Sequence, residues 1–262
     1  MKLIVLKMGG SAITNKEAPF SFRENIVENI SNELYEIYKE NKYNFIIVHG
    51  GGSFGHPLAK KYQLKSGIQN IEEQAIGFSI TRLYMTKLNT LIIEKLVSKN
   101  LPVVAVQTSA VAVTNDGKIS YFFLNILKKL LEFHMIPVMF GDVVLDEKKG
   151  FTILSGDDIA VYLAIRLKAT KLLFGLDVDG IYTKDPSLED SRLLTSLKIS
   201  SVSTIKGRTS GFDVTGGIFH KIRVASQAVK KGVKVYFFNI TEPGRLTEVI
   251  NGKGIFTELV LS

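Results

Sequence analysis

The chain has 262 residues, of which 45% are hydrophobic and 22% are charged, and these proportions are typical of a globular protein with a substantial core. It contains no cysteine, which excludes disulfides, thiolate metal sites and cysteine nucleophiles. The formal charge is +8, but the lysines are scattered and no aromatic residues interleave with a basic stripe, so we expect no nucleic-acid partner.

The sequence holds no uninterrupted run of about 18 apolar residues, the length that a membrane-spanning helix needs. The apolar part of residues 1–10 is too short for a signal peptide and is more typical of a first β-strand. The sequence therefore predicts a cytoplasmic protein with no membrane partner.

Apolar runs bounded by glycine alternate with amphipathic segments of helical length along the whole chain. The apolar runs predict strands at 3–6, 45–48, 103–106, 137–140, 171–174 and 233–238, and their continuous Val, Ile, Leu and Phe content is typical of strands covered on both faces. The amphipathic segments predict helices at 22–40, 72–99, 123–133, 157–168 and 219–231. This alternation favours the α/β class, as a three-layer αβα sandwich with a mainly parallel central sheet.

Two hairpins are expected to interrupt this alternation, with turns at Asn115-Asp116-Gly117 and at 146–150. No repeat, low-complexity tract or Pro/Ser-rich linker divides the chain, so residues 1–262 are expected to form a single domain. A Ser-Gly-Asp-Asp turn at 155–158 opens a helix and predicts a soft boundary between two lobes, 1–157 and 158–262.

The first glycine-rich turn, directly after the first strand, is Lys7-Met8-Gly9-Gly10-Ser11. Two glycines let the backbone approach a ligand closely and point successive N–H groups at an anion, and a lysine adds a point charge. A tight turn alone would also explain two glycines. Lys16, in the same loop, favours the anion-binding interpretation.

The second turn, after the next strand, is His49-Gly50-Gly51-Gly52-Ser53-Phe54-Gly55-His56. Four glycines in six positions favour close contact with phosphate at the start of a helix, which we expect to follow Pro57. The spacing also matches a dinucleotide fingerprint, but the carboxylates about 20 positions on open a long helix rather than end a strand. The P-loop pattern and the protein-kinase signatures are absent from the sequence, so any ATP chemistry must use another fold.

Two further loops carry residues suited to a nucleotide. The third runs over 175–186, follows a strand and holds three aspartates and a lysine, although a well-capped surface loop would explain it too. The fourth runs over 211–221 and leads through Thr215-Gly216-Gly217 into a helix that bears Lys221. Both fit a site in which backbone groups hold base and ribose while a lysine reaches phosphate.

In chain order, the motifs are Lys-x-Gly-Gly-Ser from Lys7, His-Gly-Gly-Gly from His49, Gly-Asp-Asp from Gly156, Asp-Val-Asp-Gly-Ile-Tyr-Thr-x-Asp-Pro from Asp177, and Thr-Gly-Gly with a following lysine. This ordered set resembles the amino acid kinase superfamily, from Lys7 to Lys221. The resemblance implies the three-layer αβα fold, with an acceptor-binding lobe at 1–157 and an ATP-binding lobe at 158–262.

Within the superfamily, residues 9–16 and 51–56 are most similar to the isopentenyl phosphate kinases, enzymes of alternative mevalonate routes. The resemblance implies ATP-dependent phosphorylation of isopentenyl phosphate to isopentenyl diphosphate, with Mg²⁺ held mostly by ATP oxygens and water and no dedicated protein metal site. It also implies a homodimer formed through the helix at 72–99. Leu176 and Phe140 differ from the residues that are more common in the family. These differences weaken the subfamily assignment more than they weaken the expected chemistry.

The resemblance also assigns roles to individual residues. Its implied catalytic residues are Lys7, Lys16, Lys221 and Asp157, with Lys16 stabilising the transferring group and Asp157 orienting the lysines. Its implied nucleotide-binding residues are Lys7, Met8, Gly9, Gly10, Ser11, Gly52, Asp177, Gly216 and Lys221. Its implied acceptor-binding residues are Gly51, His56 and Gly156.

Other interpretations stay open on the sequence. A fosfomycin-type phosphonate kinase would share much of the loop and histidine pattern, and an amino-acid kinase would need groups for both the amine and the carboxylate of its acceptor. A non-catalytic nucleotide-binding or storage protein is a third alternative. The apolar residues at 76–85 could line a pocket for an isoprenoid tail, but their helical spacing favours ordinary core or a dimer interface.

Overall fold

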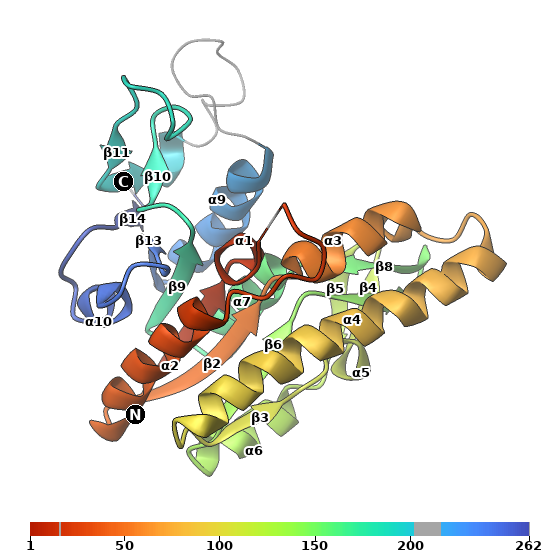
Figure 1. Cartoon of the computed structure of the whole chain (residues 1–262), viewed down its shortest axis with the longest axis horizontal. Helices are drawn as coiled ribbons and strands as arrows, with labels where there is room; N and C mark the ends of the chain where they lie inside the picture. The colour runs from red at the N-terminus through yellow and green to blue at the C-terminus, as the bar shows by residue number, and fades with distance from the viewer. Residues whose placement is uncertain (16, 202–215, 262) are drawn as a thin grey trace.

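The computed structural model of the chain describes residues 1–15, 17–201 and 216–261 and has three layers, with helices on both faces of a central sheet (Figure 1). Lys16 and residues 211–215 of the fourth loop therefore lie outside the described residues. Among the described residues, no helix is both long enough and apolar enough to cross a bilayer.

The central sheet contains, within the described residues, eight strands in the order β12-β14-β13-β9-β1-β2-β6-β3. Neighbouring strands are parallel except for β13 and β14, which are antiparallel. The strands are β1 Lys2–Met8, β2 Tyr43–His49, β3 Val103–Ala105, β6 Ile136–Phe140, β9 Lys171–Leu176, β12 Ser196–Lys198, β13 Lys234–Asn239 and β14 Thr257–Val260. The predicted αβα class with a mainly parallel sheet is confirmed.

Helices cover the two faces of this sheet and bury separate apolar cores. One core joins α1, α2, α4 and α10, and the other joins α6, α7 and α9. The helices are α1 Gly10–Ile13, α2 Glu24–Lys39, α3 Gly52–Lys61, α4 Ile71–Ser98, α5 Thr108–Val111, α6 Leu124–Glu132, α7 Gly156–Arg166, α9 Gly216–Val229 and α10 Arg245–Ile250. All five helices predicted from sequence are present within a few residues of their expected bounds.

Strand β1 shows why the apolar runs are continuous. Because successive side chains of a strand point to opposite faces, Ile4 and Leu6 join the core beneath α2 and α4, while Val5 joins the core beneath α7 and α9. Strands with both faces buried need apolar residues at every position.

The two predicted hairpins are also confirmed and form a second sheet in the order β5-β4-β7-β8, with β4 Ala112–Asn115, β5 Lys118–Phe122, β7 Asp142–Asp146 and β8 Gly150–Leu154. Further elements are a two-stranded ribbon of β10 Ile181–Tyr182 and β11 Leu193–Leu194, and the one-turn helix η1 Leu64–Ser66. Strands β10, β11, β12 and β14 and helix α10 were not expected from sequence.

Asp146 ties the two hairpin turns together. Its buried carboxylate accepts hydrogen bonds from the backbone N–H groups of Gly117 and Lys149, each at 2.8 Å, and from the hydroxyl of Thr114 at 2.7 Å. Burial raises the pKa of the Asp146 carboxyl, but these donors outweigh burial and hold the pKa well below its usual range. The carboxylate therefore stays ionised and fixes one hairpin against the other.

The prediction that a helix follows Pro57 is wrong, because α3 begins at Gly52 and contains Pro57. Proline has no N–H to donate to the carbonyl of Ser53, four residues earlier. The backbone N–H of Phe20 lies 3.5 Å from that carbonyl, so a neighbouring loop supplies a donor where the helix cannot.

The strands that precede residue 157 form one half of the central sheet, and those that follow it form the other half. This order is compatible with two lobes that share one continuous sheet. The assignment of acceptor binding to 1–157 and of ATP binding to 158–262 remains a prediction.

Candidate active site

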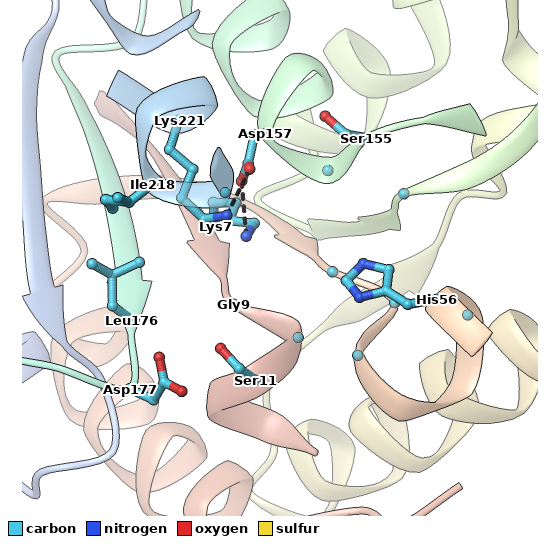
Figure 2. A pocket seen from close by; sticks show the side chains of 18 of the residues that line it. Lys7, Gly9, Ser11, His56, Ser155, Asp157, Leu176, Asp177, Ile218 and Lys221 are labelled. Carbon is cyan, nitrogen blue, oxygen red and sulfur yellow. Dashed lines mark ion pairs between the residues drawn. The ribbon is translucent and has the colours of Figure 1, made fainter. Parts of the chain in front are cut away.

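A cavity of about 610 Å³ lies at the carboxyl ends of β1, β2, β6 and β9. Its wall includes the residues that follow each of these strands: Gly9–Ser11, Gly50–Ser53, Gly141 and Asp177. In open parallel sheets, ligands bind outside the carboxyl ends of the strands, where turns and helix N-termini converge. Figure 2 shows the side chains that line this cavity.

The centre of the cavity holds one carboxylate between two lysines (Figure 2). The ammonium group of Lys7, from β1, lies 2.8 Å from Asp157 Oδ1, and that of Lys221, from α9, lies 3.0 Å from Asp157 Oδ2. Lys7 and Asp157 are 3% and 6% exposed. Asp157 sits in the first turn of α7, where the helix dipole favours a negative charge.

The pKa values of Asp157 and Lys7 depend on the charges of the neighbouring side chains. Burial raises the pKa of Asp157, but the two ammonium groups outweigh burial and hold the pKa at about 2. Burial lowers the pKa of Lys7 and is only partly offset by the charge of Asp157, while Lys221 lowers it further. One carboxylate thus faces two ammonium groups, so the three side chains together attract an anion.

Two glycine turns meet beside these lysines. A Cβ on Gly10 would lie 2.3 Å from the backbone nitrogen of Gly52, so any side chain at Gly10 would force the turns apart. Within the described part of the chain, the N–H groups of Gly10, Ser11, Gly51 and Gly52 donate to no acceptor. Four backbone donors at residues that line the cavity can therefore bind phosphate oxygens.

His56, in α3, lies across the cavity from the lysines (Figure 2). Desolvation by the surrounding protein lowers the pKa of this ring, and the charges of Lys7 and Lys221 lower it further. The ring is therefore neutral at neutral pH and can donate one N–H to an anion. Beyond it the wall becomes apolar, with Met85, Val143 and Ile153.

The opposite end of the cavity is lined by residues of the third loop and of α9. Leu176, Val178, Tyr182 and Ile218 supply apolar and aromatic surface there, and Asp177 and Lys184 supply charge. A flat apolar slot with flanking charges suits a nucleoside joined to phosphates.

A known family accounts for this arrangement. The model of the family described as the amino acid kinase family matches residues 2–239. The chain belongs to the amino acid kinase family.

The most similar relatives within the amino acid kinase family share one name. A protein of Methanothermobacter thermautotrophicus named isopentenyl phosphate kinase is 36% identical, over 97% of each chain, and one of Methanocaldococcus jannaschii with the same name is 35% identical, over 99% of each chain. A crystal structure of isopentenyl phosphate kinase has a TM-score of 0.85 with this chain at 31% identity, and the match covers 98% of this chain and 100% of that one.

Most residues that the amino acid kinase resemblance implied come together at the cavity. Those that line it are Lys7, Gly9, Gly10, Ser11, Gly51, Gly52, His56, Gly156, Asp157, Asp177 and Lys221. The side chain of Met8 instead lies in the core beneath α2. Its carbonyl accepts a hydrogen bond from the N–H of Gly50 at 3.0 Å and so links the two glycine turns. Gly216 begins α9, and Lys16 lies outside the described residues. The roles of all these residues remain predictions.

Sequence reasoning did not identify the residues of β7 and β8 that line the cavity near His56, namely Asp142, Val143, Ile153 and Leu154. The hairpin was expected, but nothing in its sequence connects it with the cavity. Of the segment 76–85, Thr81 and Met85 line the cavity, whereas Ile76 and Leu83 are 60% and 52% exposed. Burial raises the pKa of the Asp142 carboxyl above its ordinary value.

The buried ring of His49 connects the second glycine turn to α4. The ring is fully buried, with Nδ1 3.0 Å from the carbonyl of Gly50 and Nε2 3.2 Å from the side-chain amide of Asn89 on α4. Burial lowers the pKa of His49 to about 4, so the ring is neutral and has a single N–H. Both bonds form only if Nδ1 donates to Gly50 and the Asn89 amide turns its NH₂ toward Nε2. His49 therefore has a structural role, linking the second glycine turn to α4.

We predict that Asp157→Asn lowers kcat about 10²- to 10³-fold, because the two ammonium groups lose the carboxylate that holds them in place. Steady-state kinetics of the purified variant measure the effect. Asp158→Asn is the matched control, since Asp158 bonds to Ser155 and His220 at the edge of the site and should keep near wild-type turnover. Wild-type kcat in Asp157→Asn would exclude the carboxylate from organising the lysines.

We predict that the free energy of unfolding decreases as pH falls from about 6.5 to about 4, by on the order of 3 kcal/mol from His49 alone. In that window the unfolded state binds a proton that the buried ring does not. Urea unfolding across this pH range should give a flatter dependence for His49→Asn, with a residual slope from His56. Asn89→Ala keeps the buried ring and should keep the slope, whereas equal slopes in His49→Asn and wild type would contradict the assignment.

Proposed function

We propose that this chain transfers the γ-phosphoryl group of ATP to isopentenyl phosphate, forming isopentenyl diphosphate and ADP. The observation that carries the proposal is one cavity that joins a lysine–carboxylate–lysine group and free backbone donors to an apolar end. Relatives named isopentenyl phosphate kinase, aligned over nearly the whole chain, support the choice of acceptor.

The proposed step needs little covalent chemistry from the protein. An oxygen of the acceptor monophosphate attacks the γ-phosphorus, the bond from that phosphorus to the bridging oxygen breaks, and ADP leaves with the electron pair. The attacking oxygen is already anionic, so no general base is required. What the protein must supply is positive charge that offsets the repulsion between two anions.

Lys7 and Lys221 are suited to that task, because Asp157 fixes both ammonium groups at the centre of the cavity. The N–H groups of Gly10 and Gly52 would add donors on either side of the reacting oxygens. Lys16 would stabilise the transferring group, as the resemblance implies.

The acceptor would lie at the His56 end. The neutral ring of His56 can donate one N–H to the acceptor phosphate, and Gly51 and Gly156 can add backbone donors. The hydrocarbon tail would then extend along Met85, Val143 and Ile153, whose apolar surface needs no polar partner.

The nucleotide would occupy the end lined by Asp177, with Gly216 and the first turn around Ser11 beside it. Mg²⁺ fits this site only as a partner of ATP. Both oxygens of Asp157 face lysines, and within the described residues no three His, Asp or Glu side chains gather as a metal site. When bound, Mg²⁺ would be held mostly by phosphate oxygens and water and would neutralise charge on the transferring group.

We also propose that the chain forms a homodimer through α4. This helix leaves Ile76, Leu83 and Val97 60%, 52% and 51% exposed, and apolar side chains so placed on one long helix are typical of a contact surface.

No observation favours the alternative functions. An amino-acid acceptor needs partners for its amine and carboxylate, but the acceptor end is mainly apolar apart from Thr81 and Asp142. A protein that only stores nucleotide has no need for two lysines held by one buried carboxylate beside its phosphates. A phosphonate kinase would use the same loops and is distinguished by its acceptor.

The experiment that tests the function is an ADP-release assay with Mg-ATP and five acceptors in parallel: isopentenyl phosphate, fosfomycin, UMP, N-acetylglutamate and carbamate. We expect turnover with isopentenyl phosphate at a kcat/KM far above that of the others. Turnover with another acceptor would keep the kinase and refute the acceptor. ATP binding without turnover of any acceptor would favour the nucleotide-binding alternative.

We predict that His56→Ala raises the KM for isopentenyl phosphate about tenfold or more, with a smaller effect for His56→Gln, which keeps an N–H donor. The KM for ATP should change little in either variant, because His56 lies at the acceptor end. Kinetics with each substrate varied in turn measure both values. Unchanged acceptor kinetics in both variants would remove His56 from the acceptor site.

A further inference from the structure

The two glycine turns need a fixed separation, because in the proposed reaction they hold opposite sides of the transferring group. The first turn presents the N–H groups of Gly10 and Ser11, and the second presents those of Gly51 and Gly52. At the strand ends, the N–H of Gly50 donates to the carbonyl of Met8 at 3.0 Å. Beyond the strands, another contact must set the spacing.

The hydroxyl of Thr14 provides that contact. Thr14 is fully buried, and its Oγ1 donates to the carbonyl of Gly10 at 2.7 Å while accepting from the N–H of Ser53 at 3.0 Å. One hydroxyl thus bonds to the first turn through its hydrogen and to the second through its oxygen. The backbone N–H of Thr14 also donates to the carbonyl of Gly10, at 2.9 Å, which fixes the backbone of Thr14 to the first turn.

The conformation of Gly52 is matched to this hydroxyl. Gly52 has a φ of +47°, and a Cβ there would lie 2.1 Å from Thr14 Oγ1. The hydroxyl therefore occupies the space that a side chain at residue 52 would need. The N–H of Ser53 is taken up by Thr14, whereas the N–H of Gly52 has no acceptor among the described residues.

We propose that Thr14 is a positioning residue for phosphoryl transfer, whose hydroxyl fixes the donors of the second glycine turn relative to those of the first. Thr14 is absent from the cavity wall, so it acts through Gly10 and Ser53 rather than on a substrate. Loss of the hydroxyl loosens the spacing between the two sets of donors. A misplacement of about 1 Å can cost about 100-fold in rate, so the loss should appear in kcat.

The test uses Thr14→Val, which keeps the shape of the side chain and removes the hydroxyl, and Thr14→Ser, which keeps the hydroxyl. We expect Thr14→Val to lower kcat about 10- to 100-fold, with each KM within about threefold of wild type, and Thr14→Ser to restore kcat to within about threefold. Thr114→Val is the matched control, because Thr114 is equally buried and its hydroxyl bonds to Asp146 in the hairpin sheet. It should lower stability and leave kcat unchanged.

Two outcomes would overturn the proposal. Wild-type kcat in folded Thr14→Val would show that the hydroxyl does not position the turns. Equal loss in Thr14→Val and Thr14→Ser would show that keeping the hydroxyl does not preserve turnover, which contradicts the role assigned to it. If Thr14→Val does not fold, Thr14→Ala replaces it, and a kcat in Thr14→Ala equal to that of Thr14→Ser overturns the proposal in the same way.

The inference rests on the proposed function, and amide hydrogen exchange separates the two. We expect the Ser53 amide to exchange faster in Thr14→Val than in wild type or Thr14→Ser, whatever acceptor the protein uses. Absence of turnover by the wild-type chain would refute the function alone. Equal Ser53 protection in all three proteins would refute the contact that Thr14 is proposed to make.

Discussion

The carboxylate of Asp157 lies between two ammonium groups that reach it from different elements, Lys7 on β1 and Lys221 on α9. Breaking a buried pair by removing one partner leaves an uncompensated charge, which costs about 3–5 kcal/mol, so Lys7 cannot stay charged and buried here without the carboxylate. The same pairing joins the central strand of the sheet to helices of the second half of the chain. The site and the packing of these helices therefore depend on one another.

A second constraint is that two backbones must touch. The turns after β1 and β2 approach so closely that a Cβ at Gly10 would overlap the nitrogen of Gly52. Parallel pairing of β1 with β2 brings the two turns to the same edge of the sheet, and glycine lets them close to contact. His49 hydrogen-bonds to the second turn, and Thr14 hydrogen-bonds to both turns. The N–H groups of Gly10, Ser11, Gly51 and Gly52 stay available at the cavity.

The cavity changes character along its length, and the proposed choice of acceptor rests on this change. Charge and backbone donors are concentrated at its centre, where two anions would meet. Apolar side chains from α4 and from the hairpin of β7 and β8 close the acceptor end. Asp146 holds that hairpin to its neighbour through bonds to residues that do not line the cavity.

The sequence by itself determined six strands of the central sheet, five of the helices, the two hairpins and most of the residues around the central lysines, because these are local patterns of periodicity, glycine spacing and motif. It could not place the start of the helix that contains Pro57. Proline leaves the carbonyl of Ser53 without a donor from the helix, and the nearby N–H of Phe20 belongs to a loop distant in the sequence. Nor could it join Asp157 to Lys7 and Lys221, Thr14 to Ser53, or Val143 and Ile153 to the acceptor end. Those contacts link residues far apart along the chain, so only the packing of the sheet and its helices decided them.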